Sequence, residues 1–175
     1  MEFKLGARLS EPERTLAVQL LEDEKPKTRQ LAAKWVSENK SPTAMVQAAL
    51  SMFREQAFVY TLAPPRLGKE PVDDFLFNTK RGFCEHYASS FVYLMRSAGV
   101  PARIVTGYQG GEINPNGHYL IVRYSDAPAW AAFWLEDKRW VRVAPTSASP
   151  PARTASGTAA ALSVPTRPRL RSRHA

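Results

Sequence analysis

The sequence contains one cysteine, Cys84, within the stretch RGFCEHYASS. Apolar residues recur at helical spacing after it, so Cys84 falls in the first turn of a predicted helix, where free N–H groups and the helix dipole favour a thiolate. Its backbone N–H is also a candidate oxyanion donor, and Gly82 permits a tight turn before it. A lone cysteine at a helix start is commonly a small buried apolar residue as well. Spacing alone therefore leaves two interpretations open, a nucleophile and a core residue.

The composition is that of one soluble globular domain. The chain has 175 residues, of which 44% are hydrophobic and 23% are charged, and these values are ordinary for such a domain. No apolar run approaches the roughly 18 residues of a membrane-spanning helix, and the N-terminal segment has no hydrophobic signal region. A single cysteine excludes an internal disulfide and disfavours a cysteine-based metal site. We expect no metal ion and no cofactor.

The net charge of +8 is unevenly distributed along the chain. Five arginines and no acidic residue follow residue 148, so this tail contributes +5 and the rest of the chain +3. The tail contains few large apolar side chains and is predicted to be disordered. A basic tail can contact nucleic acid or an anionic membrane. Because no aromatic side chain lies between its arginines to stack on bases, we interpret it as a solvated terminus and expect no nucleic-acid partner.

Capping signals and helical periodicity predict three helices in the first 60 residues. Ser10 and Glu13 form a capping box with a proline in the first turn. Pro26 begins a second helix, and Ser41-Pro42 begins a third. A loop rich in proline and glycine follows over 62–71.

The rest of the chain is predicted to fold as helix and then sheet. A short helical segment covers 72–77, and a buried helix from Cys84 to Ser97 ends at Gly99 and Pro101. Alternating patterns predict strands over 102–108, 118–124, 129–136 and 139–143, the last two forming a hairpin. Pro128 precedes the third strand, where no ladder N–H is needed. Helices followed by antiparallel strands indicate an α+β fold.

These motifs, taken in order, resemble a known family. GFCEHYA is followed by MR-AG-PAR-VTGYQGGE, by SDA and AW around Pro128, and by WVRV and PT around Ala144. This pattern is similar to the bacterial transglutaminase-like domain, and most similar to the extracytoplasmic domain of multi-spanning membrane proteins. The resemblance extends back through YTLAPPRLG and VDDFLF, more weakly into the N-terminal helices, and stops near Thr146.

The resemblance implies a papain-like fold and a cysteine-dependent reaction. In this family a thiolate at a helix N-terminus attacks a carboxamide carbonyl, often of glutamine, and releases ammonia. An amine or water then takes the acyl group. A histidine removes the thiol proton and protonates the leaving amine, and an aspartate on the neighbouring strand fixes the imidazole tautomer. The implied partner is a protein or peptide substrate.

Carried onto this chain, the nucleophile position is Cys84, the histidine position is Pro128 and the aspartate position is Ala144. Proline has no side chain that accepts a proton, and alanine has no carboxylate. Tyr60 is a candidate oxyanion-hole hydroxyl, although a core tyrosine is the alternative. The resemblance therefore implies a transglutaminase-like domain that is inactive or nearly so.

No other residue is a convincing replacement base. His86 lies two positions after Cys84, and residues two apart on a helix do not face each other, so it is expected to pack or hydrogen-bond within the fold. His174 lies in the tail. Asp126 would discourage a thiolate and is interpreted as a turn residue.

His118 begins the predicted strand 118–124. If that strand pairs with 129–135 as a hairpin, His118 lies opposite residue 135, roughly 20 Å from position 128 at about 3.3 Å per residue. At that distance it cannot replace a base at Pro128.

We therefore expect three parts: a helical part (1–59), a transglutaminase-like core (60–147) and a disordered basic tail (148–175). The missing triad members, the absence of flanking membrane helices and the foreign composition of the tail favour a truncated fragment of a longer gene, with a pseudoenzyme as a close second. An active enzyme with a rearranged site, and a scaffold that binds peptides through the YTLAPP and GYQGGEINP loops, are the alternatives. The resemblance implies a domain outside the cytoplasmic membrane, but this chain has neither a predicted membrane span nor an export signal.

Overall fold

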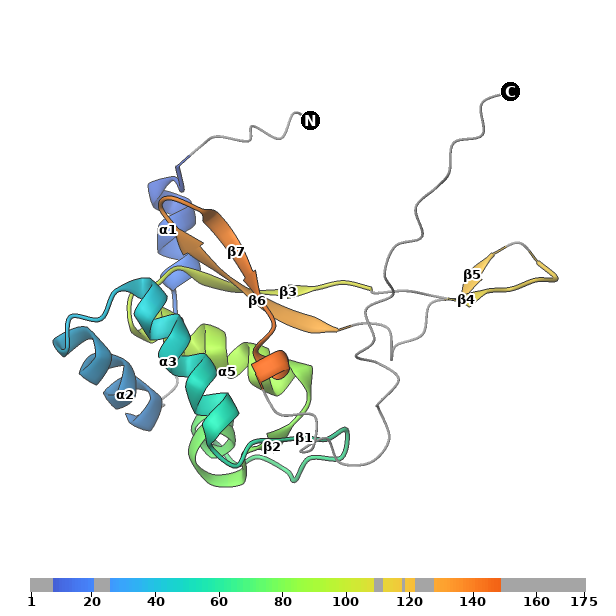
Figure 1. Ribbon diagram of the computed structural model, residues 1–175, viewed down its shortest axis with the longest axis horizontal. Coiled ribbons are helices and arrows are strands. Elements are labelled where there is room, and N and C mark those ends of the chain that lie inside the picture. Colours follow the sequence, from blue (N-terminus) through green and yellow to red (C-terminus); the bar gives the residue numbers. More distant parts are fainter. Residues whose placement is uncertain (1–7, 21–25, 109–111, 118, 122–127, 149–175) are drawn as a thin grey trace.

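The computed structural model describes residues 8–20, 26–108, 112–117, 119–121 and 128–148. Three helices come first, as predicted: α1 (Glu11–Val18), α2 (Pro26–Ser37) and α3 (Pro42–Glu55). A short helix, α4 (Pro71–Asp73), runs directly into a π-helix, η1 (Asp74–Thr79). The central helix, α5, spans Cys84–Ser97, the range predicted from the sequence. With the sheet described next, these elements confirm the α+β fold (Figure 1).

The main sheet has three antiparallel strands in the order β3, β6, β7. They are β3 (Ala102–Thr106), β6 (Ala129–Leu135) and β7 (Arg139–Val143), so the predicted hairpin between the last two is confirmed. Helix α5 packs against β6 and β3, with the rings of Phe91 and Phe133 6.5 Å apart (Figure 1). The helix that begins at Cys84 is therefore fixed against the strand that follows Pro128.

The hairpin considered between 118–124 and 129–135 is wrong. Strand β6 pairs with β3 over 129–133 and with β7 over 131–135, so both of its edges are occupied. Strand β5 (Leu120–Ile121) pairs instead with β4 (Glu112–Ile113) in a separate two-stranded sheet. His118, Asp126 and His174 lie outside the described residues, as does the predicted tail from residue 149 onward.

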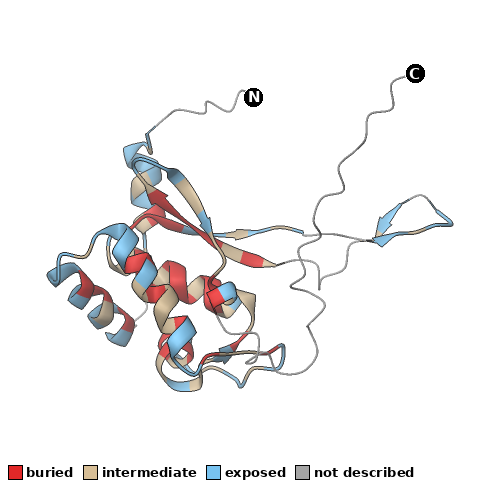
Figure 2. Cartoon of the chain, in the orientation of Figure 1, coloured by how far each residue is buried: buried red, intermediate tan, exposed pale blue. Residues whose placement is uncertain are grey.

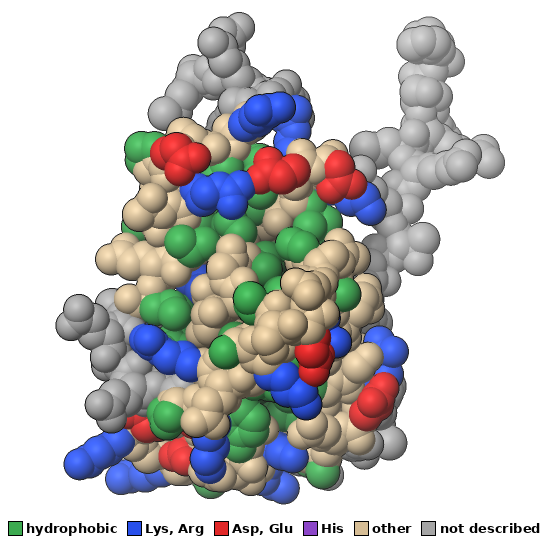
Figure 3. Space-filling model, turned by 90° about the vertical axis from the view of Figure 1, so that its left-hand side faces the viewer, with side chains coloured by type: hydrophobic (Ala, Val, Ile, Leu, Met, Phe, Trp, Pro, Cys, Tyr) green, Lys and Arg blue, Asp and Glu red, His purple; other side chains and the backbone are tan. Residues whose placement is uncertain are grey.

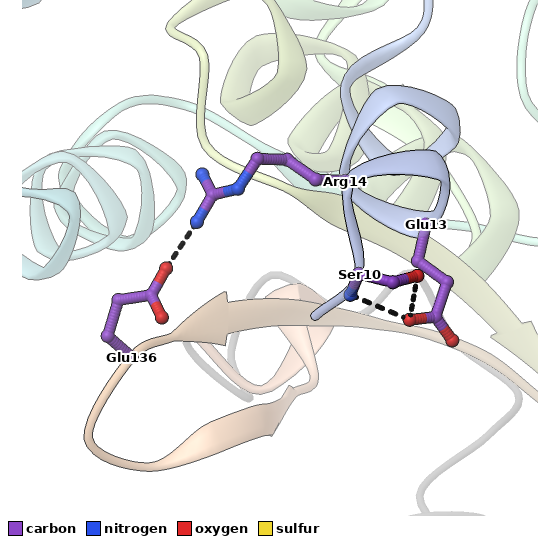
Figure 4. Close-up of polar contacts among 4 residues, drawn as sticks. All are labelled: Ser10, Glu13, Arg14 and Glu136. Carbon is purple, nitrogen blue, oxygen red and sulfur yellow. Dashed lines mark hydrogen bonds and ion pairs between the residues drawn. The ribbon is translucent and has the colours of Figure 1, made fainter. Parts of the chain in front are cut away.

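The helix starts carry the predicted caps. The backbone N–H and the hydroxyl of Ser10 both donate to the Glu13 carboxylate, at 2.9 and 2.7 Å, and Ser41 Oγ accepts a hydrogen bond from the Ala44 N–H at 3.2 Å. Arg14 forms an ion pair with Glu136 in the turn between β6 and β7 (Figure 4). Helix α1 is thereby tied to the outer end of the sheet.

The core lies where α3, α5 and the sheet meet (Figure 2). Its densest part is a group of fully buried rings from α3, η1, α5 and the segment between α3 and β1. The rings of Phe53 and Phe58 lie 5.0 Å apart, and those of Phe75 and Tyr87 also lie 5.0 Å apart, both pairs edge-on. Because Tyr87 belongs to the first turn of α5, this group anchors the end of the helix that carries Cys84.

The surface shown in Figure 3 carries Lys and Arg side chains interspersed with Asp and Glu. This face therefore presents no continuous basic area. None of the helices in the described ranges combines the length and the hydropathy that a membrane span requires. The expected division between residues 59 and 60 stays a prediction.

Candidate functional site

A short parallel strand pair places Tyr60 beside the candidate nucleophile. Strand β1 (Val59–Tyr60) pairs with β2 (Arg81–Gly82), with Tyr60 opposite Gly82. The Val59 N–H donates to the Lys80 carbonyl and the Thr61 N–H to the Gly82 carbonyl, each at 2.8 Å. Gly82 lies two residues before Cys84, so this pairing determines which side chain faces the start of α5.

The Tyr60 hydroxyl interacts with both the backbone amide and the side chain of Cys84. Burial raises the pKa of Tyr60, and the negative charge of a Cys84 thiolate raises it further, whereas the Cys84 N–H acts in the opposite direction. Tyr60 is therefore a neutral phenol near pH 7. Cys84 itself is partly exposed and is the first residue of α5. The structure thus brings together two of the sequence-predicted site residues.

Gly82 is needed for a different reason from the one inferred from the sequence. Among the described glycines only Gly99 has a positive φ, so Gly82 does not need glycine's conformational freedom. A Cβ at position 82 would instead lie 2.7 Å from the Cβ of His86 and 2.8 Å from the ring of Phe75. The absence of a side chain lets β2 approach α5 closely.

His86 packs and hydrogen-bonds within the fold, as expected. Its Nδ1 accepts a hydrogen bond from the Phe83 N–H at 3.3 Å, and its ring lies edge-on to that of Phe83, with centroids 4.4 Å apart. Burial lowers the pKa of His86, and Glu85 opposes that shift. A neutral imidazole whose Nδ1 accepts a hydrogen bond carries its proton on Nε2. Neither nitrogen then has a free lone pair, so His86 is not a base for Cys84 in this arrangement.

Pro128 and Ala144 lie at the same end of the sheet. Pro128 directly precedes β6, and Ala144 directly follows β7. The pairing of β6 with β7 ends at Ala131 opposite Val143, so Pro128 and Ala144 both lie beyond its last pair. That Pro128 and Ala144 occupy the family's histidine and aspartate positions stays a prediction.

The backbone around Ala144 is firmly held. Its carbonyl accepts hydrogen bonds from the N–H and the hydroxyl of Ser147, at 3.0 and 2.7 Å. The next residue, Pro145, is fully buried and begins the 3-10 helix η3 (Pro145–Ala148), which packs on α3 and α5. The chain is therefore fixed where β7 ends and η3 begins.

A pocket of about 460 Å³ lies beside α5, and sequence reasoning did not identify it. Its walls are largely apolar, and its polar lining includes Glu85 and His86, the two residues after Cys84, as well as Ser90. Cys84 itself does not line it. No sequence signal marks this pocket, because the burial of Ser90, which is only 1% exposed, is a property of the folded chain.

The comparisons with known proteins agree on one family. The model of the transglutaminase-like superfamily matches residues 29–145. A protein-glutamine gamma-glutamyltransferase of Pseudomonas aeruginosa is 46% identical over 137 residues, which cover 78% of this chain and 20% of that protein. The YebA protein of Bacillus subtilis is 35% identical over 127 residues, which cover 69% of this chain and 17% of that protein. The chain thus spans about a fifth of the length of these curated relatives.

A solved structure matches the fold as well. The periplasmic domain of TgpA from Pseudomonas aeruginosa superposes with a TM-score of 0.71 at 44% sequence identity. The match covers 78% of this chain and 48% of that one. The helices and the antiparallel sheet described above therefore have the arrangement of that domain.

Proposed function

The chain belongs to the transglutaminase-like superfamily, and from that premise we propose that it is a transglutaminase-like domain with impaired catalysis. In this proposal Cys84 keeps the nucleophile position and the fold keeps its peptide-binding side, while the acid–base pair is missing. The relative from Pseudomonas aeruginosa is a protein-glutamine gamma-glutamyltransferase, so the glutamine carboxamide is the group that this domain would bind.

The proposal rests on what the family reaction requires. A base must take the Cys84 proton as sulfur attacks the carboxamide carbon, and the same group must then protonate the departing ammonia. Pro128 offers no atom for either step, and Ala144 has no charge to orient or stabilise an imidazolium. Loss of general acid–base catalysis alone costs about 10²–10⁴ in rate.

One observation carries the proposal. The β6–β7 register puts Pro128 and Ala144 at the same end of the sheet, with the chain around Ala144 held by Ser147 and Pro145. A relocated acid–base pair would need other titratable side chains at that end. His86, the only histidine in the described residues, is engaged by the Phe83 N–H.

The second candidate is an active enzyme with a rearranged site, and the contact between Tyr60 and Cys84 is the observation in its favour. A phenolate at Tyr60 would be able to take the thiol proton. Burial and the neighbouring sulfur raise the pKa of Tyr60, however, so the phenolate is scarce near neutral pH. This contact therefore supports impaired catalysis better than it supports a substitute base.

The test is Cys84-dependent chemistry on a glutamine-containing peptide with a primary amine, followed as ammonia release and by mass spectrometry. We expect the natural chain to match Cys84→Ala. The double variant Pro128→His with Ala144→Asp is expected to gain at least about 100-fold over that background, the low end of acid–base catalysis. Ala144→Asp alone, the matched control, is expected to gain nothing.

Two outcomes would overturn the proposal. Turnover by the natural chain that disappears in Cys84→Ala would show that a working site exists without the family base. A double variant that is folded by circular dichroism yet remains at background would show that the scaffold for the reaction has been lost as well.

A further inference from the structure

We propose that the pocket beside α5 binds an uncharged peptide segment with a bulky apolar side chain, and that its amide carbonyl accepts hydrogen bonds from Ser90 and His86. This site is separate from the Cys84 sulfur. The inference rests on the proposed function in one respect, because it names the class of peptide that the domain would hold.

The walls of the pocket determine the apolar part of the ligand. Leu67, Phe75 and Ile104 of β3 are among the residues that line it. Ile104 is 46% exposed, which is unusual for a β-branched apolar side chain on a strand. The volume of about 460 Å³ falls in the range of small-ligand pockets, roughly 300–1,000 Å³, and exceeds a single side chain. A segment of about two residues fits better than one residue alone.

Ser90 supplies the first polar contact. It lines the pocket and is only 1% exposed. A hydroxyl in the wall of a pocket can donate its proton to an acceptor placed there. A peptide carbonyl inside the pocket is such an acceptor.

His86 supplies a second hydrogen-bond donor, and the charged residues of the pocket lining disfavour an anionic ligand. Because its Nδ1 accepts from the Phe83 N–H, the imidazole carries its proton on Nε2 and can donate it to an acceptor in the pocket. Among the described residues, the lining includes no lysine or arginine, and Glu85 is its one carboxylate. An anionic ligand would therefore be repelled without compensation, whereas a neutral amide meets two donors.

The position of the pocket suits a peptide that also passes the thiol. Glu85 and His86 directly follow Cys84, and Ala129, which directly follows Pro128, lines the pocket from β6. A peptide whose apolar residue occupies the pocket would thus have a neighbouring residue close to Cys84 and to Pro128. Since the lining does not include Cys84, binding does not require chemistry at the sulfur.

The isoleucines allow a direct test by methyl NMR. The chain has three, Ile104 in the pocket and Ile113 and Ile121 in the β4–β5 hairpin. We would label isoleucine methyl groups with ¹³C and titrate the chain with N-acetyl-phenylalaninamide, using N-acetyl-glycinamide as the probe without a side chain. We expect a saturable shift of the Ile104 methyl signal with the first probe only, and no shift of the other two.

Variants test the assigned contacts. Thr106→Trp adds a ring at the exposed pocket rim and is expected to abolish the saturable shift, whereas Thr43→Trp, at an exposed site on α3, is the matched control and should not. Ser90→Ala removes one hydrogen bond and is expected to raise Kd about fivefold. Cys84→Ala should bind as the natural chain does.

The outcomes separate this inference from the proposed function. Equal shifts at all three isoleucines, no saturation at Ile104, or equal binding by Thr106→Trp and Thr43→Trp would overturn the pocket assignment. None of these results bears on whether Pro128→His with Ala144→Asp restores turnover. Conversely, a failed rescue of turnover leaves the titration of Ile104 unaffected.

Discussion

The hydroxyl of Tyr60 contacts both the backbone amide and the thiol of Cys84. The pairing of β1 with β2 enforces this contact, because Tyr60 lies opposite Gly82. The Cys84 N–H is the candidate oxyanion donor, and in the structure the Tyr60 hydroxyl lies against it. The expectation that Tyr60 contributes to an oxyanion hole stays a prediction.

Tyr60→Phe should make Cys84 react faster with iodoacetamide. The reagent must displace the Tyr60 hydroxyl from the sulfur, and one hydrogen bond of about 1 kcal/mol corresponds to about fivefold in rate. Because Cys84 is the only cysteine, whole-protein mass spectrometry reports its alkylation directly. Tyr108→Phe, at an exposed tyrosine, should leave the rate unchanged. A rate for Tyr60→Phe that equals or falls below that of the natural chain would contradict the contact.

Gly82→Ala should destabilise the fold by about 1–3 kcal/mol, the usual cost of overpacking. The added methyl group would meet the Cβ of His86 in α5 and the ring of Phe75 in η1. Urea denaturation followed by tryptophan fluorescence measures this loss. A change below about 0.5 kcal/mol, typical of an unconstrained surface site, would mean that β2 can move away from α5 at little cost.

The local features of this fold could be predicted from the sequence. The bounds of α5 follow from the apolar residues after Cys84 and from Gly99, whose φ is +76° in the structure. Ser10 and Ser41 begin their helices as expected, because the side chain and the N–H groups it serves are a few residues apart. Such signals need no knowledge of the rest of the chain.

The non-local features could not be predicted in the same way. Strand β6 pairs with β3 rather than with 118–124. This pairing depends on where the chain places β3 after it leaves α5. The contact of Tyr60 with Cys84 depends on two-residue strands too short to leave a periodic pattern. The position of Ser90 in a pocket wall could not be predicted either, because only the packed structure shows that this residue lines a pocket.

Asp73→Ala should cost about 2–3 kcal/mol of stability, since it removes a cap and leaves buried donors without partners. The Asp73 carboxylate accepts from the N–H groups of Lys27 and Thr28, each at 3.0 Å, and it is only 5% exposed. Asp74→Ala, one residue later, is the control: that carboxylate is solvated and binds Gly68 and Asn78, so its loss should be smaller. Equal losses of free energy of unfolding would show that Asp73 does not hold α2 to the segment before η1.

His86 should make stability fall in mild acid. Burial lowers its pKa in the folded state, an effect that Glu85 only partly offsets, while the unfolded chain protonates near the usual value of about 6.5. Between these two values the unfolded state binds more protons, so the free energy of unfolding rises with pH. The full contribution is present above about pH 6.5 and is lost as the pH falls through that value toward the folded-state pKa.

His86→Gln separates this effect from other titrations. A glutamine at this third helical position can still accept the Phe83 N–H, as in a capping box, but does not titrate. His118 and His174 remain in both proteins, so their contributions cancel in the comparison. We expect the natural chain to lose more free energy of unfolding than His86→Gln between pH 7.5 and 5.5, as measured by urea titration. Equal losses would mean that His86 has the same pKa in the folded and unfolded states, and that the start of the helix carrying Cys84 is insensitive to acid.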